Sequence, residues 1–464
     1  MSLHAFFAPR SVAVIGASTV PGKSGHIIVE NLVNLGFPGA VYPINPKADR
    51  ILGIRTYPSL DECPAVPEIV VIAVPRDAVP ESMAQAGRRG VRYAVIATAG
   101  FADTGDDVGL DLDRRVHETA ASFGMRYMGP NSIGTIDTTT RFITSIVRNH
   151  TPPAGPVSLF GQTGLFASGI TRWLAQSEPF GVAKIACLGN KSDIGEIDAL
   201  GFLADDARTG VIGCYLEGAS DGREFFRVLC RAASAKPVII LKGGTSSLGS
   251  IATASHTGTL AGDAAVFRGV LRQAGAIPAE DWEDLFTLLT GFAHGPLPAG
   301  NRAGVISITG AGCVLAADAA ERHGLVVPDL SPSTIDRIRE FSPSWAPLRN
   351  PLDIWSTIER LGVEEAYHRV APVVAADPNI DMLIVATTLF DGTIFDCSSL
   401  IDKIRDVAPH KPVATVLIGG GPDENRAWTI AAHRSGAATF HSLPRAIRAL
   451  AAMRDAALRN ERSR

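Results

Sequence analysis

This sequence of 464 residues lacks several features that place a chain in a protein class directly: paired cysteines, long apolar runs and clusters of basic residues. Its six cysteines include no C-x-x-C pair and no histidine at ligand spacing, which argues against a disulfide framework and a zinc site. No stretch reaches the ~20 apolar residues of a spanning helix, and the first apolar run is too short for a signal peptide. A net charge of -4 without a basic cluster argues against nucleic-acid binding. These absences predict a cytoplasmic protein without metal, membrane or nucleic acid.

The composition that is present suits a globular α/β enzyme, with 46% hydrophobic and 19% charged residues. The length suits about three domains of roughly 150 residues, divided at two Pro- and Gly-rich segments, 151–155 and 295–300. β-Branched runs alternate with amphipathic stretches of helical length, as in parallel strands buried on both faces, and so predict three doubly wound sheets. The expected strands are 12–15, 41–44, 69–74, 93–98, 125–128, 157–160, 183–188, 211–216, 238–242, 305–308, 382–387 and 413–417.

A glycine-rich turn, 16–25, follows the first expected strand and precedes a helix, where backbone amides can bind a phosphate. The turn departs from G-x-G-x-x-G, so it could equally be an ordinary α/β turn. Lys47 stands after the second strand, where an NAD site usually has Asp or Glu. A lysine there suits an anion such as the 3′-phosphate of CoA, although most lysines are only solvated loop charges. Two further strand ends, 74–76 and 98–101, fall at the edge where open sheets bind ligands.

Three segments of the first unit resemble the CoA-binding domain of ADP-forming acetyl-CoA synthetases and succinyl-CoA synthetase α subunits: 6–18, 45–47 and 129–132. Ser132 stands where that family commonly has cysteine. The resemblance implies an N-terminal Rossmann-like CoA-binding domain, 1–150, followed by two flavodoxin-like domains, 151–298 and 299–464. The CoA contacts that it implies, together with the neighbouring strand ends, are Gly16, Ala17, Ser18, Lys47, Val74, Pro75, Thr98, Ala99, Gly100 and Asn131.

His256 lies in a run of small residues, 243–262, which predicts a mobile loop because so little side chain can be buried. Imidazole is a competent nucleophile near neutral pH, so a histidine carried on such a loop could transfer a phosphoryl group. The alternative is a plain surface histidine. The context Ser-His-Thr-Gly-x-Leu-Ala-Gly resembles the phosphohistidine loop of the same family, which favours the catalytic interpretation.

Two partners for this histidine are expected. Glu217, at the end of a predicted strand, could orient the imidazole, although a strand-end glutamate is often only solvated. Gln162, Thr163 and Gly164 form a predicted strand-turn-helix whose free amides could bind phosphate. Both segments resemble family elements, respectively the histidine-partner glutamate and the Ser-Gln-Ser-Gly turn.

The third unit is expected to serve structure and partner contact. Its segment 309–313 departs from the family's Gly-Gly-Pro-Gly at Ala311 and Cys313, and Asn350, Pro351 and Asp353 are weak candidates for ligand contact. The sequence has neither a P-loop nor an ATP-grasp domain. The resemblance therefore implies an α subunit that works with an ATP-grasp β subunit, as α2β2, with ATP or ADP and Mg2+ on that partner. The reaction would be acid + CoA + ATP = acyl-CoA + ADP + phosphate, through a phosphohistidine relay.

Two other functions stay open on the sequence alone. A nicotinamide-dependent oxidoreductase would use the same first unit but needs an acidic residue after the second strand. A CoA-binding regulatory protein would keep the turn at Gly16 and Lys47 without needing His256 and Glu217 together. The sequence does not indicate which carboxylic acid is used.

Overall fold

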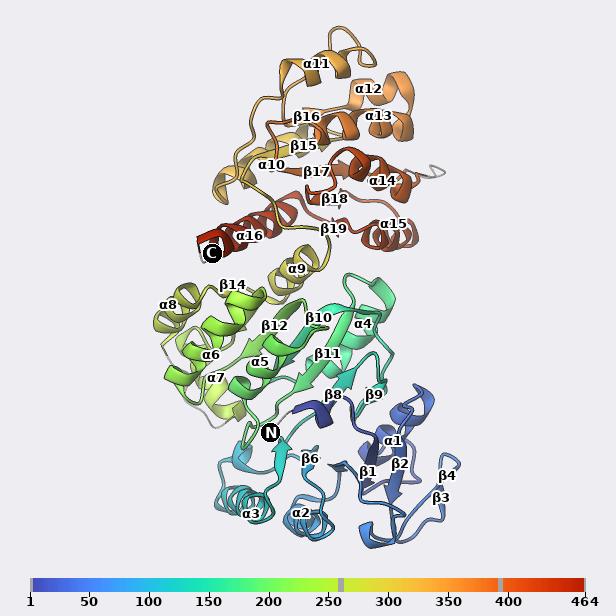
Figure 1. Ribbon diagram of the computed structural model, residues 1–464, viewed down its shortest axis with the longest axis vertical. Coiled ribbons are helices and arrows are strands. Elements are labelled where there is room, and N and C mark those ends of the chain that lie inside the picture. The colour runs from blue at the N-terminus through green and yellow to red at the C-terminus, as the bar shows by residue number, and fades with distance from the viewer. Residues whose placement is uncertain (1–2, 258–262, 391–394, 463–464) are drawn as a thin grey trace. The chain divides into compact units, whose positions relative to one another are not determined.

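The computed structural model describes residues 3–257, 263–390 and 395–462 and contains three sheets of mainly parallel strands (Figure 1). The chain forms two compact units, Met1–Gln176 with Gly181–Glu280 and Ser177–Phe180 with Asp281–Arg464. The predicted α/β fold with doubly wound parallel sheets is confirmed, whereas the division at 150 and 298 stays a prediction. Within the described ranges, every helix is too short or too polar to cross a membrane.

The first sheet is fully parallel, with strand order β2-β1-β5-β6-β7. Its strands are β1 (Ser11–Ile15), β2 (Ala40–Ile44), β5 (Ile69–Ile72), β6 (Tyr93–Ile96) and β7 (Arg126–Met128), and β3 (Arg50–Ile51) pairs with β4 (Ile54–Arg55) separately. The helices are α1 (Ser24–Asn34), α2 (Val79–Arg88) and α3 (Asp107–Phe123). Because the central strands are buried on both faces, the sequence shows them as unbroken β-branched runs.

The second sheet has the order β14-β13-β12-β10-β11-β8-β9. Its strands are β8 (Gly134–Asp137), β9 (Phe142–Ile143), β10 (Ala154–Gly161), β11 (Val182–Cys187), β12 (Val211–Leu216), β13 (Val238–Lys242) and β14 (Ile277–Ala279). Its helices are α4 (Gly169–Ser177), α5 (Glu196–Asp205), α6 (Gly222–Ala235), α7 (Ser247–Thr257) and α8 (Ala264–Ala274). The antiparallel strands β8 and β9 precede the expected linker 151–155, so the chain enters the second sheet earlier than the sequence suggested.

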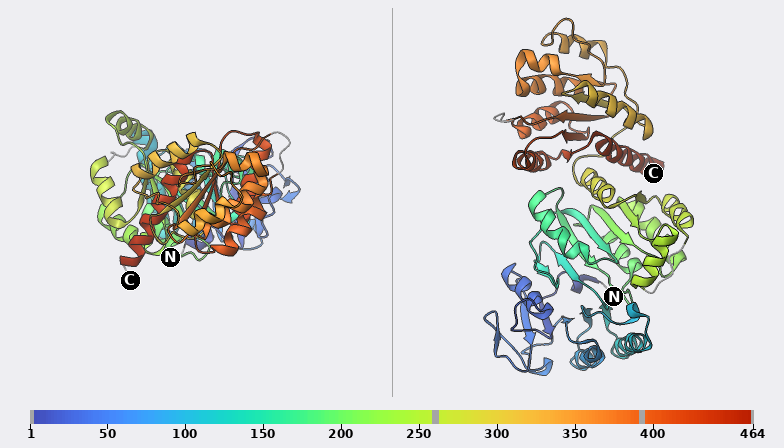
Figure 2. Two further views of the ribbon diagram at one scale, coloured as in Figure 1. Left: turned by 90° about the horizontal axis from the view of Figure 1, so that it is seen from above. Right: turned by 180° about the vertical axis from the view of Figure 1, so that it is seen from behind.

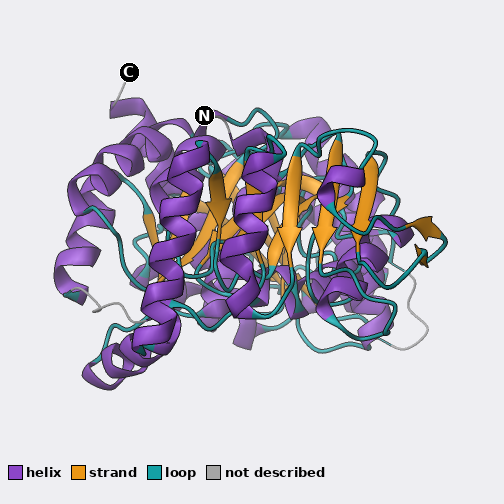
Figure 3. Cartoon of the chain, turned by 90° about the horizontal axis from the view of Figure 1, so that it is seen from below, coloured by secondary structure: helices purple, strands orange, loops and turns teal. Residues whose placement is uncertain are grey.

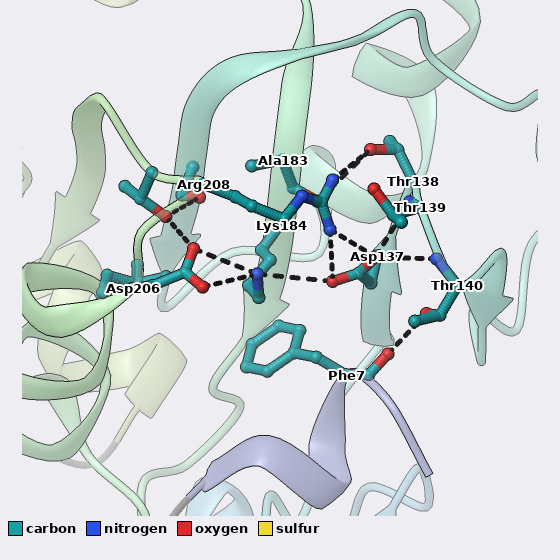
Figure 4. Close-up of polar contacts among 12 residues, drawn as sticks. Phe7, Asp137, Thr138, Thr139, Thr140, Ala183, Lys184, Asp206 and Arg208 are labelled. Atoms are coloured by element: carbon teal, nitrogen blue, oxygen red, sulfur yellow. Dashed lines mark hydrogen bonds and ion pairs between the residues drawn. The ribbon is translucent and has the colours of Figure 1, made fainter. Parts of the chain in front are cut away.

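A cluster of ion pairs and hydrogen bonds around Lys184 and Asp137 links β8 to the rest of this sheet (Figure 4). Lys184 Nζ, on β11, donates to both Asp206 carboxylate oxygens at 2.9 and 3.0 Å and lies 3.4 Å from Asp137 Oδ2. The Asp137 carboxylate also accepts from Arg208 at 3.0 Å and from the Thr139 and Thr140 amides at 2.9 and 3.0 Å. The cluster therefore connects β8, β11 and the loop after α5.

The third sheet, in the second unit, has the order β16-β15-β17-β18-β19. Its strands are β15 (Ala303–Ser307), β16 (Leu352–Asp353), β17 (Met382–Thr387), β18 (Val413–Leu417) and β19 (Ala438–Phe440). The helices are α9 (Trp282–Ala293), α10 (Gly310–Arg322), α11 (Pro332–Arg339), α12 (Trp355–Leu361), α13 (Val363–Ala375), α14 (Cys397–Val407), α15 (Pro422–Arg434) and α16 (Leu443–Arg462). Helices α10 and α16 pack together, as do α13 and α14, and the two pairs lie on opposite sides of the strands (Figures 1 and 2). Figure 3 shows the helices and strands of the chain from below.

All three sheets share one topology. The first parallel strand of each sheet lies between the second and the third, which gives switch points at β1/β5, β10/β12 and β15/β17. Ligands of open α/β sheets bind outside the carboxyl ends of the strands at such points. The candidate ligand sites are therefore the carboxyl-end edges of the three sheets at these switch points.

Candidate functional site

At the first switch point a turn approaches its neighbour too closely for any side chain. Gly16 follows β1 with φ +89°, and a Cβ added to it would lie 2.5 Å from the carbonyl oxygen of Ala73, which follows β5. Asn45 Nδ2 donates to the Ala17 carbonyl at 2.7 Å, and Ser18 Oγ accepts from the Val20 amide at 3.0 Å. The result is a backbone-lined turn directly before α1, the geometry that a phosphate-bearing ligand requires.

Lys47 lies at the end of the neighbouring strand. Its amide donates to Asn45 Oδ1 at 2.8 Å, and Asn45 also contacts the Gly16–Ser18 turn, so one asparagine connects the two segments. The Lys47 side chain is exposed. The position suits an ammonium group that meets an anionic ligand from solvent, and the ligand role of Lys47 stays a prediction.

The other predicted contacts meet at the ends of β5 and β6. Thr98 Oγ1 donates to the Val74 carbonyl at 2.7 Å, and the Thr98 carbonyl accepts from the Asn131 amide at 2.9 Å. Arg76 donates to the Gly100 carbonyl at 3.1 Å, with Pro75 before it and Ala99 between Thr98 and Gly100. The structure thus brings these strand ends together along one edge of the sheet.

Sequence reasoning missed Asp103 and Asn190 at this edge. The Asp103 carboxylate accepts from the Gly100 and Phe101 amides at 3.1 and 2.8 Å and from Asn190 Nδ2 at 2.7 Å. Burial acts to raise the pKa of Asp103, but these hydrogen bonds outweigh it and hold the pKa below its usual range. Asn190 is 87 residues further along the chain, so no local pattern could have paired the two.

The second switch point contains a buried glutamine-glutamate pair. Gln162, after β10, accepts from the Glu217 amide, after β12, through Oε1 at 2.9 Å, and the Gln162 amide donates to the Tyr215 carbonyl at 3.2 Å. Glu217 is only 4% exposed, and the Tyr215 hydroxyl donates to its Oε1 at 3.2 Å. Burial and the adjacent carboxylate raise the pKa of Tyr215 to about 12, so the hydroxyl remains a donor. The two predicted residues therefore meet at one strand-end edge.

The expected strand, turn and helix around Gln162 are present, with a 3-10 turn between the strand β10 and the helix α4. Residues Leu165–Ala167 form a 3-10 turn, η5, and α4 begins only at Gly169. Thr163 Oγ1 accepts from the Leu165 amide at 3.1 Å, and the Ser168 hydroxyl donates to the Gly164 carbonyl at 2.8 Å. These side-chain bonds compete with an α-helical start, which explains the 3-10 turn. Phosphate binding by this turn stays a prediction.

Lys242, at the end of β13, is a third residue that the sequence did not single out. Its Nζ donates to the Glu217 carbonyl at 2.9 Å and to the Gly243 carbonyl. Burial lowers the pKa of Lys242, and the nearby Glu217 carboxylate acts in the opposite direction. The lysine therefore holds the backbone of the turn on which Glu217 stands.

The expected loop around His256 is wrong for residues 247–257, which form α7 (Ser247–Thr257). Ser246 Oγ accepts from the Gly249 amide at 3.0 Å at the start of this helix, and Leu and Ala within it favour helix formation. The His256 side chain and residues 258–262 lie outside the described residues. Helix α7 contacts η4 (Ala102–Thr104), the turn that carries Asp103.

In the second compact unit the structure separates two of the weak candidates. Asn350 Oδ1 accepts from the Val305 amide at 2.9 Å, and its Nδ2 donates to the carbonyls of Ala303 and Pro328 at 2.8 and 2.9 Å. Backbone groups thus occupy both ends of this amide, which makes Asn350, next to Pro351, a structural residue. Asp353, in contrast, lines a cavity of about 540 Å³ whose other walls are Ile308, Thr309, Gly310, Trp355, Thr388, Phe390 and Ile418.

Comparisons with known proteins agree with this geometry. A family model described as a CoA binding domain matches residues 10–138, and one described as a succinyl-CoA ligase like flavodoxin domain matches residues 154–292. The α subunit of acetate–CoA ligase (ADP-forming) II from Pyrococcus furiosus is 34% identical over 90% of this chain and 90% of its own length. The chain belongs to the ADP-forming acetate–CoA ligase family.

Other members of the family differ in length. Acetate–CoA ligase (ADP-forming) II from Archaeoglobus fulgidus is 40% identical over 82% of this chain, which spans only 56% of that longer protein. A solved structure, the dinucleotide forming acetyl-coenzyme A synthetase 1 of Ca. Korarchaeum cryptofilum with phosphate and ADP, covers 99% of this chain and is matched over 98% of its own. Its TM-score of 0.88 and 30% identity show the same fold.

Proposed function

We propose that this chain is the α subunit of an ADP-forming acyl-CoA synthetase that catalyses acid + CoA + ATP = acyl-CoA + ADP + phosphate. The observation that supports this best is the second switch point. Buried Glu217 bonds there to Gln162, and α7, the helix whose range includes His256, contacts the turn beside Gly100. A carboxylate, a histidine-bearing helix and a backbone-lined turn in one compact unit are the parts that a phosphohistidine relay needs.

The first-sheet edge is the proposed CoA site. Gly16, Ala17 and Ser18 would bind phosphate through backbone amides, because the turn leaves no room for a side chain at Gly16. Exposed Lys47 would pair with a further anionic group of CoA. Thr98 and Asn131, at the neighbouring strand ends, would line the rest of the ligand.

His256 would move one phosphoryl group in two transfers. An imidazole nitrogen attacks the γ-phosphorus of ATP and ADP leaves; a carboxylate oxygen of the acid then attacks that phosphorus, which restores His256 and gives an acyl phosphate. The CoA sulfur attacks the acyl carbon, and inorganic phosphate leaves. Glu217 would accept a hydrogen bond from the other ring nitrogen and so fix the tautomer, while the Gln162–Gly164 turn would bind the phosphoryl oxygens.

We propose that a partner subunit binds the nucleotide. The Pyrococcus relative is named an alpha subunit, and this name implies such a partner. The Archaeoglobus relative extends well beyond the 56% that this chain spans. We therefore propose an ATP-grasp β subunit, in an α2β2 complex, that brings ATP or ADP and Mg2+.

Radiolabelling tests this function. The chain is purified with its partner subunit and incubated with γ-labelled ATP, and an alkali-stable, acid-labile label is expected on the α chain. His256→Asn should abolish both the label and turnover, whereas His410→Asn, at an exposed histidine of the second unit, should change neither. A normal label on the His256→Asn chain would overturn the relay. Calorimetry should detect binding of CoA and none of NADH, because Lys47 stands in place of a ribose-binding acid.

A further inference from the structure

The loop between β11 and α5 contains a buried lysine in an unusual backbone conformation. Lys191 has φ +59°, in the left-handed region that non-glycine residues rarely adopt, and its side chain is only 8% exposed. Its Nζ donates to Glu196 Oε2 at 2.7 Å and to the Gly218 carbonyl at 2.9 Å. Glycine would adopt this φ with less strain, so the interactions of the lysine side chain are what favour lysine here.

Glu196, whose carboxylate pairs with Lys191, also binds the turn after β12. Glu196, whose side chain is 0% exposed, accepts through Oε1 from both the amide and the hydroxyl of Ser220, at 2.7 and 2.9 Å. Burial acts to raise the pKa of Glu196, but Lys191 and Ser220 outweigh it and lower the pKa, so the Glu196 carboxyl is ionised at neutral pH. The pair thus holds the backbone at 218 and at 220, directly beyond Glu217.

The same loop is anchored on the first sheet. Asn190 donates through Nδ2 to Asp103 at 2.7 Å and through its amide to the Pro130 carbonyl at 2.9 Å. The Asp193 carboxylate accepts from the Tyr127 amide at 2.7 Å and from Arg126 Nε at 2.9 Å. The loop 189–196 therefore connects the proposed CoA edge to the turn of Glu217.

From these contacts we propose that Lys191 is a positioning residue for phosphoryl transfer. Through Glu196 and the Gly218 carbonyl it fixes Glu217 relative to the CoA edge, so that Glu217 meets the imidazole of His256 in one orientation. This role rests on the proposed function of Glu217. It predicts a defect in phosphorylation rather than in CoA binding, because the residues of the CoA edge keep their own hydrogen bonds.

The test uses Lys191→Met and Glu196→Gln in the complex with the partner subunit. Each variant should slow the labelling of His256 by ATP by about 10- to 100-fold, the usual effect of a small misplacement of a catalytic group, while the Kd for CoA changes less than about threefold. The control Arg231→Met breaks the exposed ion pair with Asp205 in the same unit and should change neither quantity. Glu196→Gln preserves shape and serves as the second probe if Lys191→Met does not fold.

A double-mutant cycle separates positioning from a general effect on stability. If Lys191 acts through Glu217, Lys191→Met/Glu217→Ala should label no more slowly than Glu217→Ala alone. Independent, multiplying losses would overturn the proposal, as would labelling at the wild-type rate in both Lys191→Met and Glu196→Gln. Wild-type labelling in Glu217→Ala would instead remove the proposed role of Glu217, and the positioning role with it.

Discussion

Replacing Lys184 by methionine tests whether the charge cluster of Figure 4 holds β8 on the second sheet. The change keeps most of the side-chain volume and removes the ammonium group that lies between Asp137 and Asp206. The side chains of Lys184 and Asp137 are 6% and 2% exposed, so water cannot readily replace the lost charge. The unit should therefore unfold more easily.

The expected loss follows from the groups that remain. Breaking a buried ion pair costs about 3–5 kcal/mol, because the surviving charge is left without compensation. Here Asp137 keeps Arg208 and two backbone amides, and Asp206 keeps the Thr209 hydroxyl. The loss should thus lie at the lower end of that range, about 3 kcal/mol, or a fall in Tm of about 5 °C for a unit of this size.

The pH dependence gives a second measure. Burial acts to raise the pKa of Asp206, but Thr209 and Lys184 outweigh it and lower the pKa. The stabilisation is thus present above the unfolded pKa of about 3.9 and is lost as the pH falls through the folded pKa. Without Lys184 the folded carboxyl takes up its proton at higher pH. The penalty of the variant should therefore be largest at neutral pH and shrink below about pH 5.

Urea unfolding followed by circular dichroism, at pH 7 and at pH 4, measures both effects. Arg227→Met breaks an exposed i,i+3 pair with Glu224 and should cause no measurable loss of stability at either pH. A loss below about 1 kcal/mol for Lys184→Met at pH 7, or an equal loss at the two pH values, would refute the reasoning.

Two further predictions concern other parts of the chain. Gly16→Val should remove measurable CoA binding in calorimetry, because the new Cβ would lie 2.5 Å from the Ala73 carbonyl oxygen. The control is Gly53→Ala, at a glycine that also has a positive φ, +81°. It should leave the CoA affinity unchanged, because no described atom lies within 4 Å of its new Cβ. The stacked rings of His294 and His433 are 3.9 Å apart, and burial lowers the pKa of His294 to about 4 and, with the His294 ring, that of His433 to about 3. The unfolded chain binds these protons below about pH 6.5, so stability should fall by about 4 kcal/mol between pH 7 and pH 5. A His294→Gln/His433→Gln variant should flatten that slope in thermal unfolding.

Long parallel strands that are buried throughout are among those that the sequence predicted best. Met382–Thr387 and Val413–Leu417 match β17 and β18 because fully buried parallel strands read as continuous apolar runs. β8 and β9 escaped prediction because they are short; in addition, β8 pairs with β11, about 50 residues later in the chain, and β9 pairs only with β8 among the described strands. The sequence predicts a loop where the structure has α7, because the small residues of this segment lack an amphipathic pattern.

The candidate site could be predicted residue by residue but not as an arrangement. Strand ends pointed to Gln162 and Glu217 separately, yet only the strand order β12-β10 makes them neighbours. Lys191 and Asp103 left no local signal, because each acts through contacts with segments distant in sequence. A positive φ at a lysine and a carboxylate that accepts backbone amides are properties of the folded chain.

The two edges of the first unit suit different halves of one reaction because their chemistry differs. At the first edge, backbone groups surround Gly16 and the positively charged side chain of Lys47 is exposed to solvent. This edge therefore favours a large anionic ligand that binds from solvent. The second edge places a carboxylate, Glu217, in a position 4% exposed, where a protonated ring nitrogen is a suitable partner and a free anion is not. In the proposed function, CoA would therefore bind only at the first edge and His256 would act only at the second. The loop 189–196 forms hydrogen bonds to both edges and can therefore fix their positions relative to each other.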